Sequence, residues 1–247
     1  MNTSASGSAQ QDKVGGLAAL YLAAAYVVAM PYFLVFVKYT NVVDPVENVV
    51  DPVERVNLLI SNHDSMRIMN LITYVVFGIV LAVLALSLHA RLRRGAPALS
   101  QAATVVGCIW AVMLVASGLT FNAGMAAVVD LHASSPAQAV TAWQTIEPVA
   151  DGLGSSGGEL LGGLWVLLVS LAALRGAALP KALNWCGVAV GAAGVLTNVP
   201  ALADLATVFG LLQIVWFVWL GIVMLRTASR RLVPVAPSER VDVAPRY

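Results

Sequence analysis

Charge is the scarcest property of this sequence. Only 11% of its 247 residues are charged, and its mean hydropathy is +0.82, whereas charged residues make up about a quarter of a soluble domain. Its two cysteines, Cys108 and Cys186, both stand inside apolar runs, which argues against a disulfide framework. The sequence also lacks HxxxH, CxxC and HExxH spacings, a nucleophile elbow and a phosphate-binding loop. We therefore expect no bound metal, no cofactor and no nucleic-acid partner.

Long uncharged apolar runs take the place of the missing charge. A helix that crosses the bilayer needs ~20 apolar residues, and six runs approach or exceed that length. They predict an all-α, polytopic integral membrane protein with six transmembrane helices, at about 14–37, 66–88, 98–122, 155–174, 182–199 and 205–225. Residues 14–226 would form one membrane domain, between a disordered tail at 1–13 and a second tail at 227–247.

The distribution of basic residues predicts the orientation of these helices. With six spans and both termini in the cytoplasm, eleven basic residues fall on the inner side and three, Lys38, Arg55 and Arg67, on the outer side. An excess of arginine and lysine marks the cytoplasmic side of a membrane protein. Scarce lysine with abundant alanine, valine and glycine hints at a bacterial genome, so we expect a protein of the bacterial plasma membrane. Ten acidic residues would lie outside, which favours cations near that face.

Two polar segments would connect the helices on the outer side, at 38–65 and 123–154. The first holds a tandem repeat, NVVDPVE at 41–47 and again at 48–54, with a proline in each copy. We interpret it as a duplication in a tolerant surface loop, in preference to a functional acidic motif. In the second segment, Ser135 and Pro136 predict the start of a short interfacial helix that ends before Pro148.

Glu159 is the sharpest candidate for a functional residue. Counting back from Arg175 places the start of its helix near Ser155, so Glu159 would lie about one turn inside the apolar layer, where an ionisable group suggests a functional site. It could bind a cation, relay a proton or pair with a basic residue. The plainer interpretations are a first-turn carboxylate stabilised by the helix dipole, or a structural ion pair of Arg67 with Glu159 or Asp204.

Three further residues of the outer side, His63, Asp64 and His132, resemble metal ligands with acidic neighbours. Adjacent His and Asp residues do not by themselves converge on one ion, and no ligand spacing supports a site. With Glu159, these residues would be the candidates for an enzyme active site on the outer face.

Small and polar residues inside the apolar runs predict how the helices contact one another. The pairs Gly158 with Gly162 and Gly187 with Gly191 have a spacing that lets helices approach closely. We expect them to pack the fourth and fifth predicted helices within one chain, in preference to forming a dimer. Side-chain amides inside the runs are expected to form interhelical hydrogen bonds: Asn122, Asn184, Asn198 and Gln213.

Three stretches carry a family resemblance: SMRI at 65–68, GGLWVLL at 162–168, and residues 175–183 followed by WCGVAVG at 185–191. With most of residues 15–226, they make the chain similar to an uncharacterised family of bacterial multi-pass membrane proteins, a domain of unknown function. The resemblance implies a compact helical membrane domain. It brings no activity, substrate or site residue with it.

The absence of a catalytic constellation predicts a non-enzymatic membrane protein that binds a lipid or small hydrophobic ligand, or that serves as an accessory subunit. Its partners would be membrane lipids, with a membrane-protein partner or a homodimer as a further possibility. The first alternative is a small transporter that uses Glu159, because the hairpin ends at 86–97 and 169–180 look alike, as in transporter repeats. Shared composition explains that likeness as well. The second alternative is a membrane enzyme with a site on the outer face.

Overall fold

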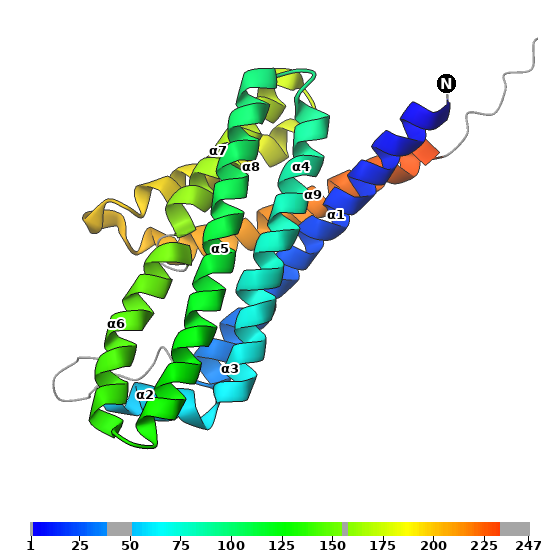
Figure 1. Cartoon of the computed structure of the whole chain (residues 1–247). Coiled ribbons are helices and arrows are strands. Elements are labelled where there is room, and N and C mark those ends of the chain that lie inside the picture. Colours follow the sequence, from blue (N-terminus) through cyan, green and yellow to red (C-terminus); the bar gives the residue numbers. More distant parts are fainter. Residues whose placement is uncertain (1, 39–50, 155–157, 233–247) are drawn as a thin grey trace, which may run out of the picture.

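The computed structural model describes residues 2–38, 51–154 and 158–232 (Figure 1). Within those ranges the elements are all helices, and no strand occurs. Proline marks several helix starts: Pro97 and Pro136 each occupy the first position of a helix, where the missing N–H costs no hydrogen bond. The expected all-α fold is therefore confirmed.

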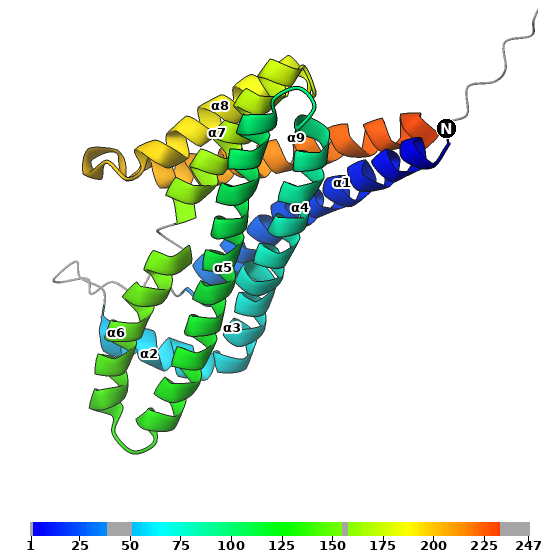
Figure 2. The same ribbon diagram turned by 45° about the horizontal axis from the view of Figure 1, so that its top comes forward.

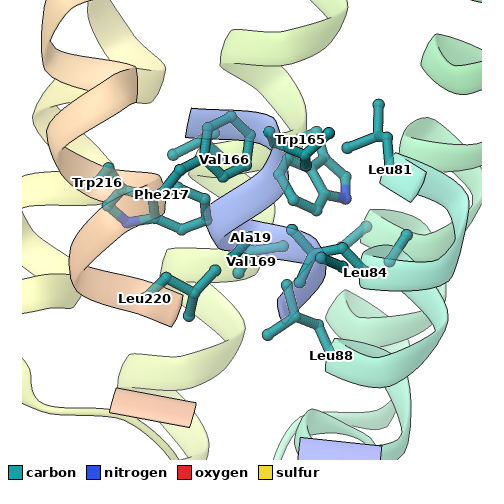
Figure 3. Packing of buried hydrophobic residues seen from close by; sticks show 14 of the residues in the cluster. Ala19, Leu81, Leu84, Leu88, Trp165, Val166, Val169, Trp216, Phe217 and Leu220 are labelled. Atoms are coloured by element: carbon teal, nitrogen blue, oxygen red, sulfur yellow. The ribbon is translucent and has the colours of Figure 1, made fainter. Parts of the chain in front are cut away.

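Six helices form the main bundle: α1 (Asn2–Pro31), α4 (Phe77–Leu92), α5 (Pro97–His132), α7 (Gly158–Gly176), α8 (Lys181–Leu196) and α9 (Leu205–Leu232). Helices α4 and α5 form one hairpin and α7 and α8 a second, while α1 and α9 lie side by side (Figure 1, Figure 2). In the core, Trp165 of α7 contacts Trp216 and Phe217 of α9 next to buried leucines of α4 (Figure 3). All six helices contribute residues to this one apolar core.

Five helical stretches are long and apolar enough to cross a membrane: Ser6–Phe36, His63–Leu92, Pro97–His132, Pro136–Gly176 and Leu205–Arg231. Each corresponds to one predicted span and extends beyond it at one end or at both, and the fourth runs over residues 155–157, which lie outside the described residues. The remaining prediction, 182–199, corresponds to α8, which has only 16 residues. The structure therefore shows a helical protein with five candidate spans.

Where the structure describes them, the two segments predicted as outer loops are mostly helical, and residues 39–50 of the first segment lie outside the described residues. They contain α2 (Pro52–Ser61), α3 (His63–Asn70) and α6 (Pro136–Gly154), and α5 continues to His132. With the last turns of α5, these helices form what we call the cap, at the end of the bundle opposite the α4–α5 turn (Figure 1). A second apolar cluster holds the cap together, with Leu59, Met66, Met125 and Trp143 buried in it. Such scattered apolar positions are too sparse to mark a membrane span but sufficient to pack short helices.

Proline does not end the helices of the cap as expected. Helix α6 begins at Pro136, as predicted, but runs through Pro148 to Gly154. In the second copy of the tandem repeat, Asp51 caps α2 by accepting hydrogen bonds from the backbone N–H groups of Val53 and Glu54, at 2.8 and 3.2 Å. This copy therefore starts a helix instead of a loop, whereas the first copy, 41–47, lies outside the described residues.

Residues 2–13, for which a disordered tail was predicted, belong to helix α1 in the structure. The physical reason is Asp12, whose buried carboxylate contacts Arg91 of α4 at 3.0 Å and Arg231 of α9 at 2.9 Å. Arg91 also donates two hydrogen bonds to the carbonyl oxygen of Ala178, at 3.1 and 3.0 Å. We call Asp12, Arg91 and Arg231 the Asp12 cluster. It fixes the first turns of α1 to the bundle.

Glycines let α7 and α8 contact each other through their backbones. A Cβ atom at Gly191 would lie 2.7 Å from the carbonyl oxygen of Gly163, and one at Gly194 would lie 2.8 Å from that of Glu159. Gly187 faces the Ser170 hydroxyl of α7 in the same interface. Packing within one chain is therefore confirmed for Gly187 and Gly191. Gly162 instead leaves room for the rings of Trp110 and Phe209.

The predicted interhelical hydrogen bonds are present for one of the four amides. Asn122 of α5 donates to the carbonyl oxygen of Arg67 in α3 at 3.2 Å and accepts from Asn70 at 3.4 Å. Asn184 and Asn198 bond to nearby carbonyl oxygens of their own turns. The buried amide of Gln213 has no hydrogen-bond partner among the described residues. The presence of an amide side chain in an apolar run does not by itself distinguish an interhelical hydrogen bond, a hydrogen bond within one turn and a buried amide without a described partner.

Candidate functional site

A cavity of about 380 Å³ lies inside the bundle, where α1, α4, α5, α7 and α9 meet. We call it the bundle cavity. Its lining is mostly apolar, and it includes Gly210 of α9, where an added Cβ would meet no atom within 4 Å. The cavity therefore has open space that a side chain at this position would enter. Its volume falls in the range of small-molecule sites in proteins.

Aromatic rings form a packed wall on one side of the bundle cavity. Tyr26 of α1 and Phe77 of α4 meet edge to face, with their centroids 5.3 Å apart, and Phe77 lies 6.3 Å from Trp110 of α5. Contacts of this geometry stabilise each ring in place. Trp110 is buried, and its Nε1 has no hydrogen-bond partner among the described residues. The wall thus presents fixed aromatic surface to the cavity.

Glu159 is the one charged side chain among the described residues that line the bundle cavity. It stands in the first turn of α7, as predicted, and its Oε2 is buried without a hydrogen-bond partner in the described part of the chain. The helix dipole and a hydrogen bond from the backbone N–H of Glu159 itself stabilise the carboxylate at this position, but neither gives Oε2 a partner. Glu159 is therefore the chemically distinctive group of the cavity.

Glu159 also lies deeper in the molecule than the sequence indicated. The prediction placed a polar segment with a short interfacial helix before it, but α6 continues to Gly154 and packs along α5. Gly154, at the end of α6, lies against Leu114, and Gly162 of α7 lies against Trp110. Glu159 therefore stands level with the middle of α5, between bundle and cap.

A second cavity, of about 280 Å³, lies in the cap, and we call it the cap cavity. Arg55 of α2 and Glu147 of α6 line it and form an ion pair, with both carboxylate oxygens 3.1 Å from Arg55 Nη1. Asp151 and Asn70 line it as well. Sequence reasoning missed Arg55 and Glu147, because they belong to two separate outer segments and lie 92 residues apart in the chain.

Phe33 and Tyr74 line both cavities, so the two cavities adjoin at these side chains. Each residue stands in a π-helical segment: Phe33 in η1 (Tyr32–Phe36) and Tyr74 in η3 (Leu71–Val76). The backbone N–H of Val37 donates to Tyr32 O at 2.9 Å, a bond five residues long. Isolated π-helical turns inside α-helices are frequent at functional sites. No signal in the sequence marks them.

Arg67 and Asp204 do not take part in the site. Both are exposed, and none of the four ion pairs of the described residues joins Arg67, Glu159 or Asp204. The pairing expected among these three residues is therefore not formed in the described part of the chain.

The residues resembling metal ligands are not brought together either. His63 Nδ1 lies 3.3 Å from Asp64 Oδ1, and this Asp64 carboxylate is almost fully exposed. His63 Nε2 and His132 Nδ1 are buried without a hydrogen-bond partner among the described residues. No group of three histidine, cysteine or acidic side chains converges in the ranges that the structure covers. These residues therefore provide no constellation for an enzyme on the outer face.

The bundle cavity combines aromatic faces, apolar surface and one carboxylate, which is a set suited to binding a small molecule. The sequence contained one usable signal for this cavity, which is the Glu159 carboxylate in an otherwise apolar helix. Tyr26, Tyr74 and Trp110 gave no such signal, because aromatic residues in apolar runs more often form core. Comparisons with protein-family models, with curated proteins and with solved structures found no match to this chain.

Proposed function

We propose that this chain is an integral membrane protein with six spans and both termini in the cytoplasm of a bacterium, and that it binds a small hydrophobic ligand in the bundle cavity. Five stretches long and apolar enough to cross a membrane support the membrane location. Exposed apolar side chains such as Leu86, Val112 and Val215 support it too, because they would contact lipid. We also retain the proposed kinship with the bacterial family named above.

An even number of spans agrees best with the distribution of basic residues along the chain. Helix α8 is about 24 Å long at ~1.5 Å per residue, slightly less than the ~30 Å hydrocarbon layer. Because α8 packs against α7 as an antiparallel hairpin, its crossing would place Lys181 and the arginines at the end of α9 on one side. That arrangement preserves the excess of basic residues on the cytoplasmic side.

The observation that carries the binding function is the cavity itself, with Glu159 inside it. At ~1.5 Å per residue, Glu159 lies about 24 Å along α7 from Arg175. The cavity would therefore open within the membrane layer or at its outer edge, where hydrophobic molecules gather. Binding, rather than reaction, fits the absence of a nucleophile–base pair among the described residues that line the cavity.

Transport is the second candidate, because the two cavities adjoin. Between them stand the π-helical segments with Phe33 and Tyr74, which interrupt the regular α-helical hydrogen bonding. Interrupted helices at a binding site are typical of secondary transporters. A transporter would depend on Glu159, so an unchanged solute- or ion-linked phenotype in Glu159→Gln cells would argue against this alternative.

A cavity-filling substitution tests the binding function. In lipid nanodiscs, saturable binding of the neutral probe neopentylbenzene is measured by equilibrium dialysis against empty nanodiscs. We expect the wild-type chain to bind the probe and Gly210→Leu to lose binding, because the leucine enters the cavity. Gly152→Leu is the matched control, since Gly152 also has no atom near an added Cβ but lines neither cavity. Equal binding by all three proteins would contradict the proposal.

A further inference from the structure

We propose that the ligand of the bundle cavity is a hydrophobic organic cation, an amine or quaternary ammonium compound whose charged end lies beside Glu159. This inference rests on the function proposed above and names the chemical class of its ligand. It follows from three features of the cavity: its charge, its aromatic faces and its size.

The charge of the cavity is negative and uncompensated. Glu159 is its one charged lining residue in the described part of the chain, and its buried Oε2 has no hydrogen-bond partner there. A carboxylate oxygen that is buried without a hydrogen-bond partner is costly. The adjoining cap cavity holds the ion pair of Arg55 with Glu147. The bundle cavity, through Glu159, therefore favours a positively charged occupant.

The aromatic lining suits an organic cation and not a metal ion. Six aromatic residues line the bundle cavity: Tyr26, Phe33, Tyr74, Phe77, Trp110 and Phe209. The faces of such rings attract ammonium groups, and aromatic cages around quaternary ammonium ligands use this attraction. Hard metal ions instead require several oxygen ligands, and no group of three metal-ligating side chains occurs among the described residues.

The volume and rigidity of the cavity agree with a small amphipathic molecule. About 380 Å³ holds a ring and a substituted ammonium group with space to spare. The edge-to-face contacts of Tyr26, Phe77 and Trp110 hold the wall in place before a ligand arrives. A preformed wall lowers the entropic cost of binding.

A pair of isosteric probes tests the inference. Benzyltrimethylammonium and neopentylbenzene have the same shape, but the first carries a positive nitrogen where the second has carbon. Their saturable binding to the full chain is measured by equilibrium dialysis in nanodiscs of zwitterionic lipid, with empty nanodiscs subtracted. The comparison on the wild-type chain needs no substitution, so it does not depend on the folding of a variant.

We expect the wild-type chain to bind the cation more tightly than the neutral probe. Glu159→Gln should weaken cation binding by about tenfold or more and leave binding of the neutral probe unchanged. Asp130→Asn is the control, because this carboxylate is exposed on α5 and lines neither cavity. It should change neither affinity.

The remaining outcomes separate the two proposals. If both probes bind the wild-type chain equally, or if Glu159→Gln and Asp130→Asn have the same effect on the cation, the organic-cation inference is overturned and the binding function stands. If neither probe binds saturably, both proposals fail.

Discussion

Loss of the Asp12 carboxylate should destabilise the whole bundle, although Asp12 stands in a segment whose composition predicts a disordered tail. The Asp12 side chain is only 4% exposed and Arg91 is 12% exposed, whereas Arg231 is 42% exposed. In Asp12→Ala, Arg91 keeps its two hydrogen bonds to Ala178 but loses the only opposite charge that it contacts among the described residues. The perturbation thus leaves a largely buried guanidinium without its counter-ion.

The magnitude follows from the two contacts of the carboxylate. A hydrogen bond to a charged group contributes about 1.5–3 kcal/mol, and an exposed ion pair contributes about 0–1 kcal/mol. Because Arg91 retains its carbonyl acceptor, the full cost of an isolated buried charge does not apply. We expect Asp12→Ala to lower the free energy of unfolding by about 2–3 kcal/mol, with most of the loss coming from the Arg91 contact.

The assay is equilibrium unfolding by sodium dodecyl sulfate in mixed micelles, applied to a double-mutant cycle. The coupling energy between Asp12 and Arg91 should be about 2 kcal/mol, and that between Asp12 and Arg231 below about 1 kcal/mol, because the Arg231 side chain is 42% exposed. If Asp12→Ala changed the stability by less than about 0.5 kcal/mol, residues 2–13 would not be anchored, and the reasoning would be refuted.

Three further predictions concern packing, the cap and topology. Gly191→Leu should destabilise the chain by about 2–4 kcal/mol in the same titration, because its side chain would meet the backbone of Gly163 at the α7–α8 contact; an effect within about 0.5 kcal/mol would show that the contact is loose. Arg55→Gln should raise amide hydrogen exchange in α2 and α6 but not in α4, because the ion pair with Glu147 joins only cap helices; equal changes throughout would mean that cap and bundle open together. In a chain whose native cysteines are replaced, Asn198→Cys should react with an impermeant thiol reagent added outside the cell, because six spans with both termini in the cytoplasm place the exposed α8–α9 turn there; labelling only from inside would require a different number of spans or the opposite orientation.

The helices of the bundle could be predicted because their signal is local. Helix α9 begins at Leu205, as expected. Helix α7 ends at Gly176 and α8 begins at Lys181, on either side of the turn predicted near Pro180. Uncharged runs of this length have few alternatives to a helix in a membrane. The glycine spacing at 187 and 191 likewise predicted close packing between neighbouring helices.

The cap and the amino-terminal helix could not be predicted because their stability comes from contacts between distant residues. Asp12 meets Arg91 79 residues later in the chain, and Arg55 meets Glu147 92 residues later. Trp143 of α6 and Met125 of α5 are buried in one apolar cluster, and the sequence does not show that these two helices pack against each other. The sequence placed Glu159 too near the surface for the same reason, since its position depends on α6 continuing through Pro148 and packing along α5. Of the site itself, only Glu159 was identified in advance, because a lone carboxylate in an apolar run is visible in sequence and a cavity is not.

Native mass spectrometry of the protein released from its own membrane in mild detergent tests the binding function most directly. We predict one reproducible additional mass on the wild-type chain and on Gly152→Leu, and its loss from Gly210→Leu, whose side chain would enter the bundle cavity. A wild-type chain that carries no additional mass, or one retained unchanged in Gly210→Leu, would contradict ligand binding in this cavity.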